Sequence, residues 1–371
     1  MAYKVPFVDL PAMFKLMKGE LSEVLEEVIF NRADFIMRSD LREFEHNFAE
    51  FMGMKHAIGV NSGTDALYLS LRAAGVSSGD EVITVAHTFV ATLASIVHCG
   101  ATPILIDVGQ DFNMNVSQLE SAITNQTKAI IPVHLNGRLC KMDKVMEIAN
   151  QRNLIVIEDT CQSLGAKFDG QKGGTFGLTG CWSLYPMKIF GGAGDGGILV
   201  TNDDAVANQI RCLRDHGQDR KTGEIIGYGI NSRLDNLQAA ILDLKLQYFS
   251  GWIDRRREIA ETYRLGLKDL PIQLPHYNDE RYYDVYQNYV IRSSQRDGLL
   301  DHLNTNGIEV LVSWPKPVYS NKSLALDHYK LPETEQICQE VISLPMNTEL
   351  ADEQIEYVID TIQNFQFDLK T

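Results

Sequence analysis

The sequence predicts an α/β protein with a large domain built on a mostly parallel mixed sheet, flanked by helices, and a smaller α+β domain at the C-terminus. The first observation behind this prediction is that short aliphatic runs alternate with segments of helical spacing. Strands that are apolar on both faces need helices on both sides of their sheet. The second is composition: 371 residues, 44% hydrophobic and 22% charged, are typical of a globular chain of more than one domain.

Aliphatic runs mark the strands expected in the large domain. They lie at Glu81–Val85, Thr102–Asp107, Ala129–Val133, Leu154–Asp159, Trp182–Tyr185 and Gly197–Thr201. Helical periodicity separates the earlier runs, in ALYLSLRAAG, ATLASIVHCG and MDKVMEIANQR. We therefore expect the large domain to cover residues 12–250, with residues 1–11 packing as an N-terminal arm.

A long helical pattern begins near Gln238 and is expected to break only at Ser250 and Gly251. It leads into the smaller domain, expected over residues 251–371. That domain contains the strand candidates VYQNYVIR and IEVLV, the helix candidate GLLDHLNTNG, and a final helix from about Asp352. Strands and helices mixed in this way indicate an α+β unit.

Charge and cysteine usage exclude several classes of function. The formal net charge is -15 and the basic residues form no run, which argues against nucleic acid or an anionic membrane as partner. The six cysteines include no C-x-x-C pair and the nine histidines are isolated, so no metal site is expected. We find no secretory h-region and no apolar run of ~20 residues, and so expect a cytoplasmic protein.

Three segments carry the candidate chemistry. In GVNSGTDAL, Gly63 and Thr64 follow a turn at the start of a helical pattern, where free backbone N–H groups bind an anion or merely cap the helix. In IVIEDTCQSLGA, Asp159 ends an aliphatic strand, at the edge where open α/β sheets bind ligands. That carboxylate either caps the next turn or pairs with a cationic nitrogen of a bound ring.

The third segment is SLYPMKIFGGAGDGG, in which Lys188 stands between Ser183 and a series of glycines. The order is the reverse of a phosphate-binding P-loop, whose glycines precede its lysine. A solvated loop lysine is the plain alternative. Together, however, an anion site, a strand-end carboxylate and a glycine-flanked lysine are what pyridoxal phosphate requires: a phosphate cradle, an acid at its pyridine nitrogen and a Schiff-base lysine.

The ordered set GVNSGTDAL, GDEVIT, TFVAT, GATPILIDV, IEDTCQSLGA, SLYPMK, GDGGILVTND, HGQDR and NSRLDNLQAAIL resembles the DegT/DnrJ/EryC/StrS family. These are pyridoxal-phosphate-dependent nucleotide-sugar aminotransferases of fold type I. The resemblance covers nearly the whole chain. It implies a homodimer whose subunits share their active sites, and an amino group taken from L-glutamate.

The resemblance also implies a role for individual residues. Lys188 would form the Schiff base and move the proton, and Asp159 would keep the pyridine nitrogen protonated. The cofactor would be further held by Gly63, Thr64, Phe89, Gln162, Ser183 and, from the neighbouring subunit, Asn231, although His87 could compete with Phe89 for the face of the ring. The substrate would be bound by Arg233, Tyr185, Trp314 and Tyr319. The segment that begins at Asn231 is also a plausible helix N-cap.

The segment GGAGDGG after the lysine looks more like the members acting on 3-oxo sugars than like those acting on 4-oxo sugars. We therefore expect a UDP- or dTDP-linked 3-oxo sugar, on a route to an amino or acetamido sugar of a cell-surface polysaccharide such as the O-antigen of lipopolysaccharide. A 4-oxo substrate is the alternative within the family. A non-catalytic regulator is the alternative of another class, although it would be expected to lose Lys188 or Asp159.

Three stretches depart from the family pattern on the side expected to bind the sugar. FIMRSD has Arg38 and Ser39 where Gly-Pro is usual, VHLNG has Asn136 where an aromatic residue is usual, and SWPKPVY is altered throughout. Arg38 either meets an anionic part of the substrate or faces solvent. The departures predict an unusual sugar.

Overall fold

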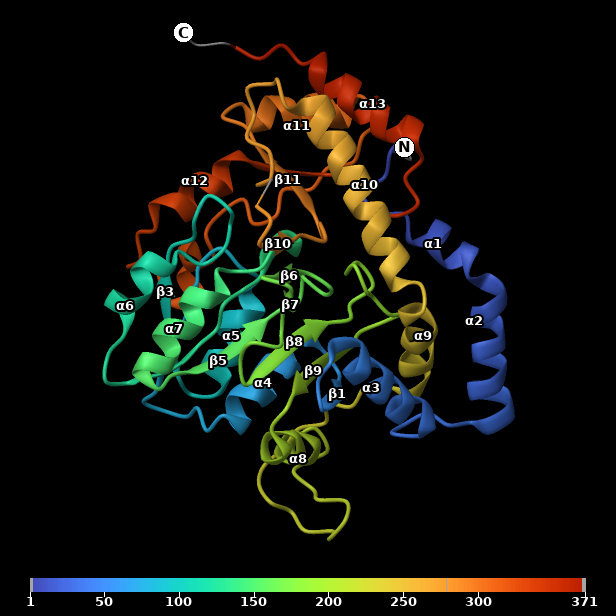
Figure 1. Ribbon diagram of the computed structural model, residues 1–371, viewed down its shortest axis with the longest axis vertical. Helices are drawn as coiled ribbons and strands as arrows, with labels where there is room; N and C mark the ends of the chain where they lie inside the picture. Colours follow the sequence, from blue (N-terminus) through green and yellow to red (C-terminus); the bar gives the residue numbers. More distant parts are fainter. Residues whose placement is uncertain (1–2, 278, 369–371) are drawn as a thin grey trace.

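The computed structural model describes residues 3–277 and 279–368, and its centre is a seven-stranded sheet (Figure 1). The strand order is β1-β9-β8-β5-β4-β2-β3. The strands are β1 (His56–Val60), β2 (Glu81–Val85), β3 (Thr102–Ile106), β4 (Thr127–Ile130), β5 (Ile155–Asp159), β8 (Thr179–Ser183) and β9 (Gly197–Thr201).

The sheet is mixed, and β9 is its reversed strand. β8, β5, β4, β2 and β3 pair with their neighbours in parallel, whereas β9 is antiparallel to both β8 and β1. The remaining strands therefore end at one edge, where open α/β sheets bind their ligands. The predicted α/β class with a mostly parallel mixed sheet is confirmed.

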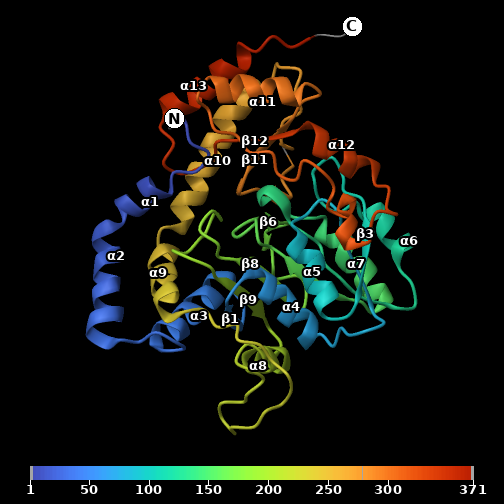
Figure 2. The same ribbon diagram turned by 180° about the vertical axis from the view of Figure 1, so that it is seen from behind.

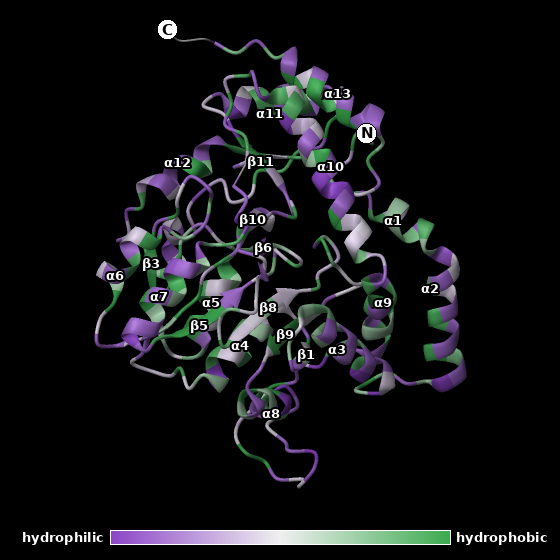
Figure 3. Cartoon of the chain, viewed as in Figure 1, coloured by the Kyte–Doolittle hydropathy of each residue, from purple (hydrophilic) through white to green (hydrophobic). Residues whose placement is uncertain are grey.

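Helices cover the sheet, and two of them begin at a residue whose side chain caps the helix. The helices are α3 (Ser39–Met52), α4 (Gly63–Ala73), α5 (Val90–His98), α6 (Leu119–Ala122), α7 (Met142–Arg152), α8 (Asp204–Leu213) and α9 (Asn236–Leu246), with 3-10 turns at Val116–Gln118 and Leu135–Gly137. Ser62 caps α4, and Asp203 caps α8 by accepting from the N–H groups of Ala205 and Val206. In Figure 3 the strands β3 and β5 are mainly green, and the surrounding helices carry both colours. Most of the buried residues of α3, α4 and α8 are apolar, so the apolar faces of these helices point into the core.

The N-terminal segment runs along one side of the molecule. α1 (Leu10–Leu16), α2 (Lys18–Leu25) and the π-helix Glu26–Arg32 follow one another, and α2 packs beside α9 (Figures 1 and 2). Before them, Lys4 and Val5 donate backbone hydrogen bonds to Gly307, and Val5 is buried. Of the expected arm, Met1 and Ala2 lie outside the described residues.

The C-terminal third forms a second hydrophobic cluster, which includes Tyr263, Ile291, Ile342 and Val358. The elements of this C-terminal third are α10 (Phe249–Leu267), β11 (Tyr289–Arg292), α11 (Arg296–Thr305), α12 (Pro332–Glu340), β12 (Val341–Leu344) and α13 (Asp352–Gln363), with 3-10 turns at Val318–Ser320 and Lys322–Leu324. β11 and β12 pair antiparallel, and a small sheet elsewhere joins β10 (Tyr282–Tyr283), β6 (Lys167–Phe168) and β7 (Gln171–Lys172). The boundary expected at residues 250 and 251 stays a prediction.

Two expectations about this region are wrong. The helical pattern breaks at Gln247 and Tyr248, and Ser250 and Gly251 lie inside α10. The turn is set by the burial of Phe249 against other aromatic rings, and one glycine in a helix costs only about 1 kcal/mol. Residues 308–312 form no strand, because they make only isolated bridges, from Ile308 to Val5 and from Leu311 to Ser343.

Candidate active site

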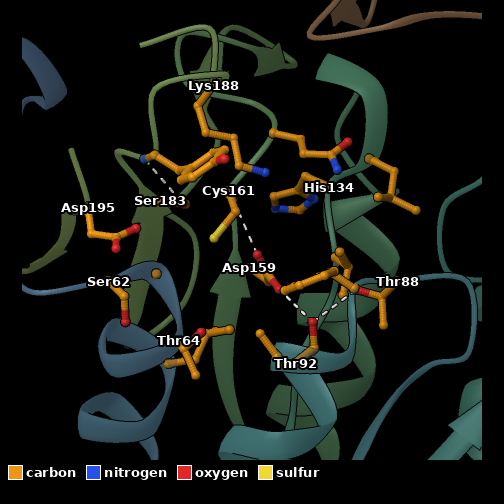
Figure 4. A pocket seen from close by; sticks show the side chains of 18 residues that line it. Ser62, Thr64, Thr88, Thr92, His134, Asp159, Cys161, Ser183, Lys188 and Asp195 are labelled. Carbon is orange, nitrogen blue, oxygen red and sulfur yellow. Dashed lines mark hydrogen bonds between the residues drawn. The ribbon is translucent and has the colours of Figure 1, made fainter. Parts of the chain in front are cut away.

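A cavity of about 380 Å³ opens at the carboxyl edge of the sheet. Its walls come from the ends of β1, β2, β4, β5 and β8 and from the loops that follow them (Figure 4). Among the residues singled out from sequence, the structure brings together Gly63, Thr64, Phe89, Asp159, Gln162, Ser183, Tyr185 and Lys188. They are far apart in the sequence and meet because parallel strands end at the same edge.

Asp159 lies at the floor of the cavity and is 5% exposed. Its Oδ2 accepts a hydrogen bond of 2.8 Å from the hydroxyl of Thr92, and its Oδ1 accepts one of 3.2 Å from the backbone N–H of Cys161. In the described part of the chain, no lysine, arginine or histidine forms a salt bridge with it. A buried carboxylate without a cationic partner is costly, so the site favours a ligand that brings a positive charge or an N–H donor.

The side chain of the neighbouring Glu158 makes different contacts from that of Asp159, because successive residues of a strand point to opposite faces of the sheet. Its carboxylate accepts hydrogen bonds from the backbone N–H groups of Gly174, Phe176 and Gly177 and contacts His134 Nε2 at 3.0 Å. The other ring nitrogen of His134 accepts from the N–H of Cys140, so Nε2 carries the hydrogen that is donated to Glu158. These contacts hold the His134 ring in the wall of the cavity.

Lys188 reaches into the cavity from the loop that follows β8 (Figure 4). No hydrogen bond or salt bridge engages its amino group within residues 3–277 and 279–368. Between Lys188 and Asp159 stands Cys161, whose pKa is raised well above its usual value by burial and by the nearby Asp159. The thiol therefore stays neutral, which leaves the amino group of Lys188 as the group that faces the cavity without a bonding partner among the described residues.

An anion cradle lies at the start of α4. Ser62 uses its side chain to accept from the N–H of Asp65, whereas the N–H groups of Gly63 and Thr64 face no acceptor among the described residues. A Cβ on Gly63 would stand 2.9 Å from Cβ of Ser183 and 3.0 Å from Sγ of Cys161. The helix dipole and these free N–H groups suit a phosphate, with the Ser183 hydroxyl beside them.

The remaining residues singled out from sequence do not line this cavity. Asn231 is exposed, and Arg233 binds Asp215 at 3.1 Å. Burial opposes ionisation of Asp215, yet hydrogen bonds and charge from Arg220 and Arg233 hold its pKa below the usual value. Arg38 has an exposed side chain 3.6 Å from Asp34, so it faces solvent.

The aromatic candidates divide between the cavity and the protein interior. Phe89 lines the cavity and is 61% exposed, whereas His87 is buried against Phe112 and Trp314. Tyr319 is also buried, and its hydroxyl donates to Glu335. The structure thus places Phe89 rather than His87 at the cavity wall.

A model of the DegT/DnrJ/EryC1/StrS aminotransferase family matches residues 17–363. One relative, "Pleiotropic regulatory protein" of Geobacillus stearothermophilus, is 41% identical over 97% of this chain and 98% of its own. Another, "UDP-N-acetyl-3-dehydro-alpha-D-glucosamine 3-aminotranferase" of Acidithiobacillus ferrooxidans, is 38% identical over 97% of each chain.

The crystal structure of S. venezuelae DesV, in complex with a ketimine intermediate, superposes with a TM-score of 0.94 at 36% identity and covers 98% of each chain. The chain belongs to the DegT/DnrJ/EryC1/StrS aminotransferase family. The structure of NtdA from Bacillus subtilis, with bound cofactor PMP, matches with a TM-score of 0.91 at 29% identity, over 98% of this chain and 85% of that one. The protein is therefore a pyridoxal-phosphate-dependent aminotransferase.

The cavity of this aminotransferase fits the cofactor on three structural grounds. It holds a buried carboxylate without a cationic partner, an uncommitted amine, and a helix start whose N–H groups are free. These are the complements of a pyridine nitrogen, an aldehyde and a phosphate. Asp159, Lys188 and the Gly63–Thr64 turn could hold the three groups.

Sequence reasoning on this aminotransferase missed several cavity residues, among them Ser62, Thr88, Thr92, His134, Cys161 and Asp195. Ser62 could have been found as the N-cap serine of the turn before α4. Thr92 and His134 gave no local signal in the sequence, because they act through hydrogen bonds to Asp159 and Glu158 that are made across the sheet.

No described group of three or more His, Cys, Asp or Glu could hold a metal ion. No described helix is long and apolar enough to span a membrane.

Proposed function

We propose that this aminotransferase moves an amino group from L-glutamate to a UDP- or dTDP-linked 3-oxo sugar, in the biosynthesis of an amino or acetamido sugar for a cell-surface polysaccharide. The observation that carries the proposal is the pairing of Lys188 and Asp159 in one cavity, each without an ionic partner among the described residues. The sugar is suggested by the Acidithiobacillus relative, whose name specifies a UDP-linked 3-dehydro sugar.

Bound pyridoxal phosphate supplies an electron sink that stabilises negative charge on the carbon losing its proton. Lys188, whose amino group faces the cavity, would hold the aldehyde of the cofactor and would serve as the general base that accepts and returns the proton. Asp159, whose carboxylate is fixed by Thr92 and by the N–H of Cys161, would hold the pyridine nitrogen. Gly63, Thr64 and Ser183 would hold the phosphate.

The walls of the cavity orient the reacting groups. Phe89 lines the cavity and would stack on one face of the ring. Gln162 also lines the cavity, and its Oε1 is fixed there because it accepts a hydrogen bond of 3.0 Å from the N–H of Asn136. Tyr185 lines the cavity and is 47% exposed, so its ring is accessible to an entering sugar. Trp314 packs edge-on against the buried His87, and Tyr319 is held by Glu335 and by the N–H of Leu331. Neither residue lines the cavity, so any contact with the sugar would require a rearrangement of the segment around residue 314.

A second subunit would account for the predicted site residues that lie outside the cavity. Asn231 is exposed and lies away from the cavity of its own chain, and Phe89 is unusually exposed for an aromatic residue. We infer a homodimer in which Asn231 of the partner subunit reaches the phosphate. Arg233 would then bind the carboxylate of glutamate or the substrate, and a monomer would be inactive.

Two other functions are distinguished by specific observations. Against the 4-oxo alternative, the glycine-rich loop after Lys188 reads GGAGDGG, as in the members that act on 3-oxo sugars, and its Asp195 lines the cavity. A regulatory role is suggested by the printed name of the Geobacillus relative. A regulator without catalysis has no use for an uncommitted lysine opposite a buried carboxylate, so the geometry favours the enzyme.

The test combines spectroscopy with product analysis. The protein is incubated with pyridoxal phosphate, and its near-ultraviolet and visible absorbance is recorded before and after excess L-glutamate. We expect a Schiff-base band that glutamate bleaches, that Lys188→Ala lacks, and that the exposed control Lys144→Ala keeps. Mass spectrometry of reactions with matched UDP- and dTDP-linked 3-oxo and 4-oxo sugars then identifies the acceptor. A bleached band with no aminated sugar would refute the substrate, and no band in the wild-type protein would refute the chemistry.

A further inference from the structure

The segment that carries Lys188 has little regular structure of its own. It lies in the loop between β8 and β9, where Lys188 N donates to Tyr185 O at 2.8 Å and Gly192 N donates to Leu184 O at 2.8 Å. No strand or helix ladder fixes the residues next to the lysine. The direction of the Lys188 side chain therefore depends on contacts from elsewhere in the fold.

One buried side chain supplies such contacts on both sides of the lysine. Oε1 of Gln287 accepts a hydrogen bond of 2.6 Å from Ile189 N–H, and Nε2 of Gln287 donates one of 3.2 Å to the carbonyl of Met187. The single side-chain amide of Gln287 is thus hydrogen-bonded to the backbone of both residues that flank Lys188. The reverse orientation of the amide would place oxygen against oxygen and N–H against N–H, so this orientation is fixed by the partners.

The backbone of Gln287 is itself held firmly. The buried Arg256 in α10 donates from Nη1 to the carbonyls of Tyr286 and Gln287, at 3.0 and 3.3 Å. On the other side the backbone of Tyr286 packs directly against Gly137, which has a φ of +93°. A Cβ at Gly137 would stand 2.4 Å from Tyr286 N, so only glycine fits there. Val285 N also donates to Gly137 O at 2.9 Å. The segment 285–288 is therefore docked on two separate elements.

The next residue reaches the opposite wall of the cavity. Nδ2 of Asn288 donates to Oδ1 of Asn136 at 3.2 Å, and the N–H of Asn136 donates to Oε1 of Gln162 at 3.0 Å. Two adjacent side chains of one segment thus connect to the lysine loop and to the wall that holds Gln162. Neither Gln287 nor Asn288 lines the cavity, so they act through the residues they hold.

We propose that Gln287 is a positioning residue that fixes the direction of Lys188 and, together with Asn288, sets the separation of the lysine from the Gln162 wall. The inference rests on the proposed role of Lys188 as the covalent and proton-transferring residue. Misplacing such a group by about 1 Å costs on the order of a hundredfold in rate. The C-terminal part of the chain thereby determines how the reactive amine of the large sheet is presented.

The experiment compares Gln287→Met, which keeps the length of the side chain without its hydrogen bonds, with the wild-type holoenzyme and apoprotein. Pyridoxal phosphate is added to the apoprotein, and the rate of Schiff-base formation is measured by absorbance. We expect this rate to fall about tenfold and kcat to fall about thirty- to a hundredfold. KM for L-glutamate should change by less than about threefold, because the lost contacts are not substrate contacts.

Gln287→Glu provides a conservative variant with its own signature. It keeps the acceptor for Ile189 N–H but can donate to Met187 O only when its carboxyl is protonated. Its kcat relative to wild type should therefore rise as the pH is lowered. If Gln287→Met does not fold, this ratio decides alone, and a ratio that stays flat with pH would overturn the inference.

The matched control is Gln238→Met. Gln238 binds the same loop beyond the lysine, because its Oε1 accepts from Ala193 N at 2.9 Å. We expect this variant to lose stability while its Schiff-base formation and kcat stay within about twofold of wild type. Equal losses in the two variants, or wild-type kinetics in Gln287→Met, would overturn the positioning role. A band that persists in Lys188→Ala would instead overturn the proposed function, so the two failures are distinct.

Discussion

Thr92 donates a hydrogen bond of 2.8 Å to Oδ2 of Asp159 from a position 67 residues earlier in the chain. The hydroxyl oxygen of Thr88 lies 2.9 Å from that of Thr92. Because the hydroxyl hydrogen of Thr92 is donated to Asp159, the hydroxyl of Thr88 is the donor in the hydrogen bond between the two threonines. The first turn of α5 and the residues before it thus orient the carboxylate at the floor of the cavity. The chain of hydroxyls points Asp159 at the place proposed for the pyridine nitrogen.

Thr92→Val should weaken cofactor binding through this contact. The substitution conserves shape and removes the donor to a buried carboxylate, a contact worth about 1.5–3 kcal/mol. We expect the affinity of the apoprotein for pyridoxal phosphate, measured by titration of absorbance, to fall about tenfold or more. Thr88→Val, which removes only the outer hydroxyl, is the matched control and should cost less. Equal losses in the two variants would contradict the arrangement.

Gly63→Ala tests the anion cradle. The new Cβ would stand 2.9 Å from Cβ of Ser183 and 3.0 Å from Sγ of Cys161, and it must displace both side chains. We expect phosphate-bearing cofactor to bind about tenfold more weakly, while pyridoxal without phosphate loses little. Gly251→Ala is the control: apart from its chain neighbours and the backbone of its own helix, no described atom lies within 4 Å of the added Cβ, and a helical alanine should stabilise the protein by about 1 kcal/mol. Equal weakening of both ligands by Gly63→Ala would argue against a phosphate site there.

The fold and the chemical centre could be predicted because their signals are local. Aliphatic runs bounded by turns locate strands, and a carboxylate such as Asp159 at the end of a strand needs no partner to be noticed. The glycines after Lys188 are likewise visible in the sequence. The resemblance then supplied roles that spacing alone left open, such as that of Gln162.

The remainder depends on contacts between distant residues. Nothing near Gln287 in the sequence indicates that its amide holds the residues flanking Lys188, since the two segments are about 100 positions apart. The segment Ile308–Val312 has the composition of a strand, yet it forms only isolated β-bridges, each of a single residue pair. Composition reports the preference of a segment, whereas pairing requires a partner of matching length and register.

Tyr319→Phe distinguishes the two roles open to this residue. The family resemblance implied contact with substrate, whereas the structure buries the ring, and its hydroxyl donates to Glu335 and accepts from the N–H of Leu331. If the contacts are structural, the variant should lower the free energy of unfolding by about 1–2 kcal/mol and leave KM for the sugar unchanged. Urea denaturation and steady-state kinetics measure the two quantities. A raised KM with unchanged stability would restore the substrate role.

His87 should make the stability of the protein depend on pH. Burial, with a smaller contribution from the charge of Arg292 that Asp107 opposes, lowers the pKa of His87 from 6.5 to about 4. Between these values the unfolded chain binds a proton that the folded chain excludes. The stability is therefore complete above pH 6.5 and falls as the pH decreases toward 4, by on the order of 3 kcal/mol.

The measurement compares urea denaturation at pH 7 and pH 5 for the wild-type protein and for His87→Asn, which cannot titrate. We expect the wild type to lose more stability than the variant over this interval, and the difference between their losses is the contribution of His87. His46→Asn is the matched control, because that side chain is 69% exposed. A loss in His87→Asn equal to that of the wild type would show that the protonated ring is accommodated beside Phe112 and Trp314, and that the acid sensitivity of the fold has another source.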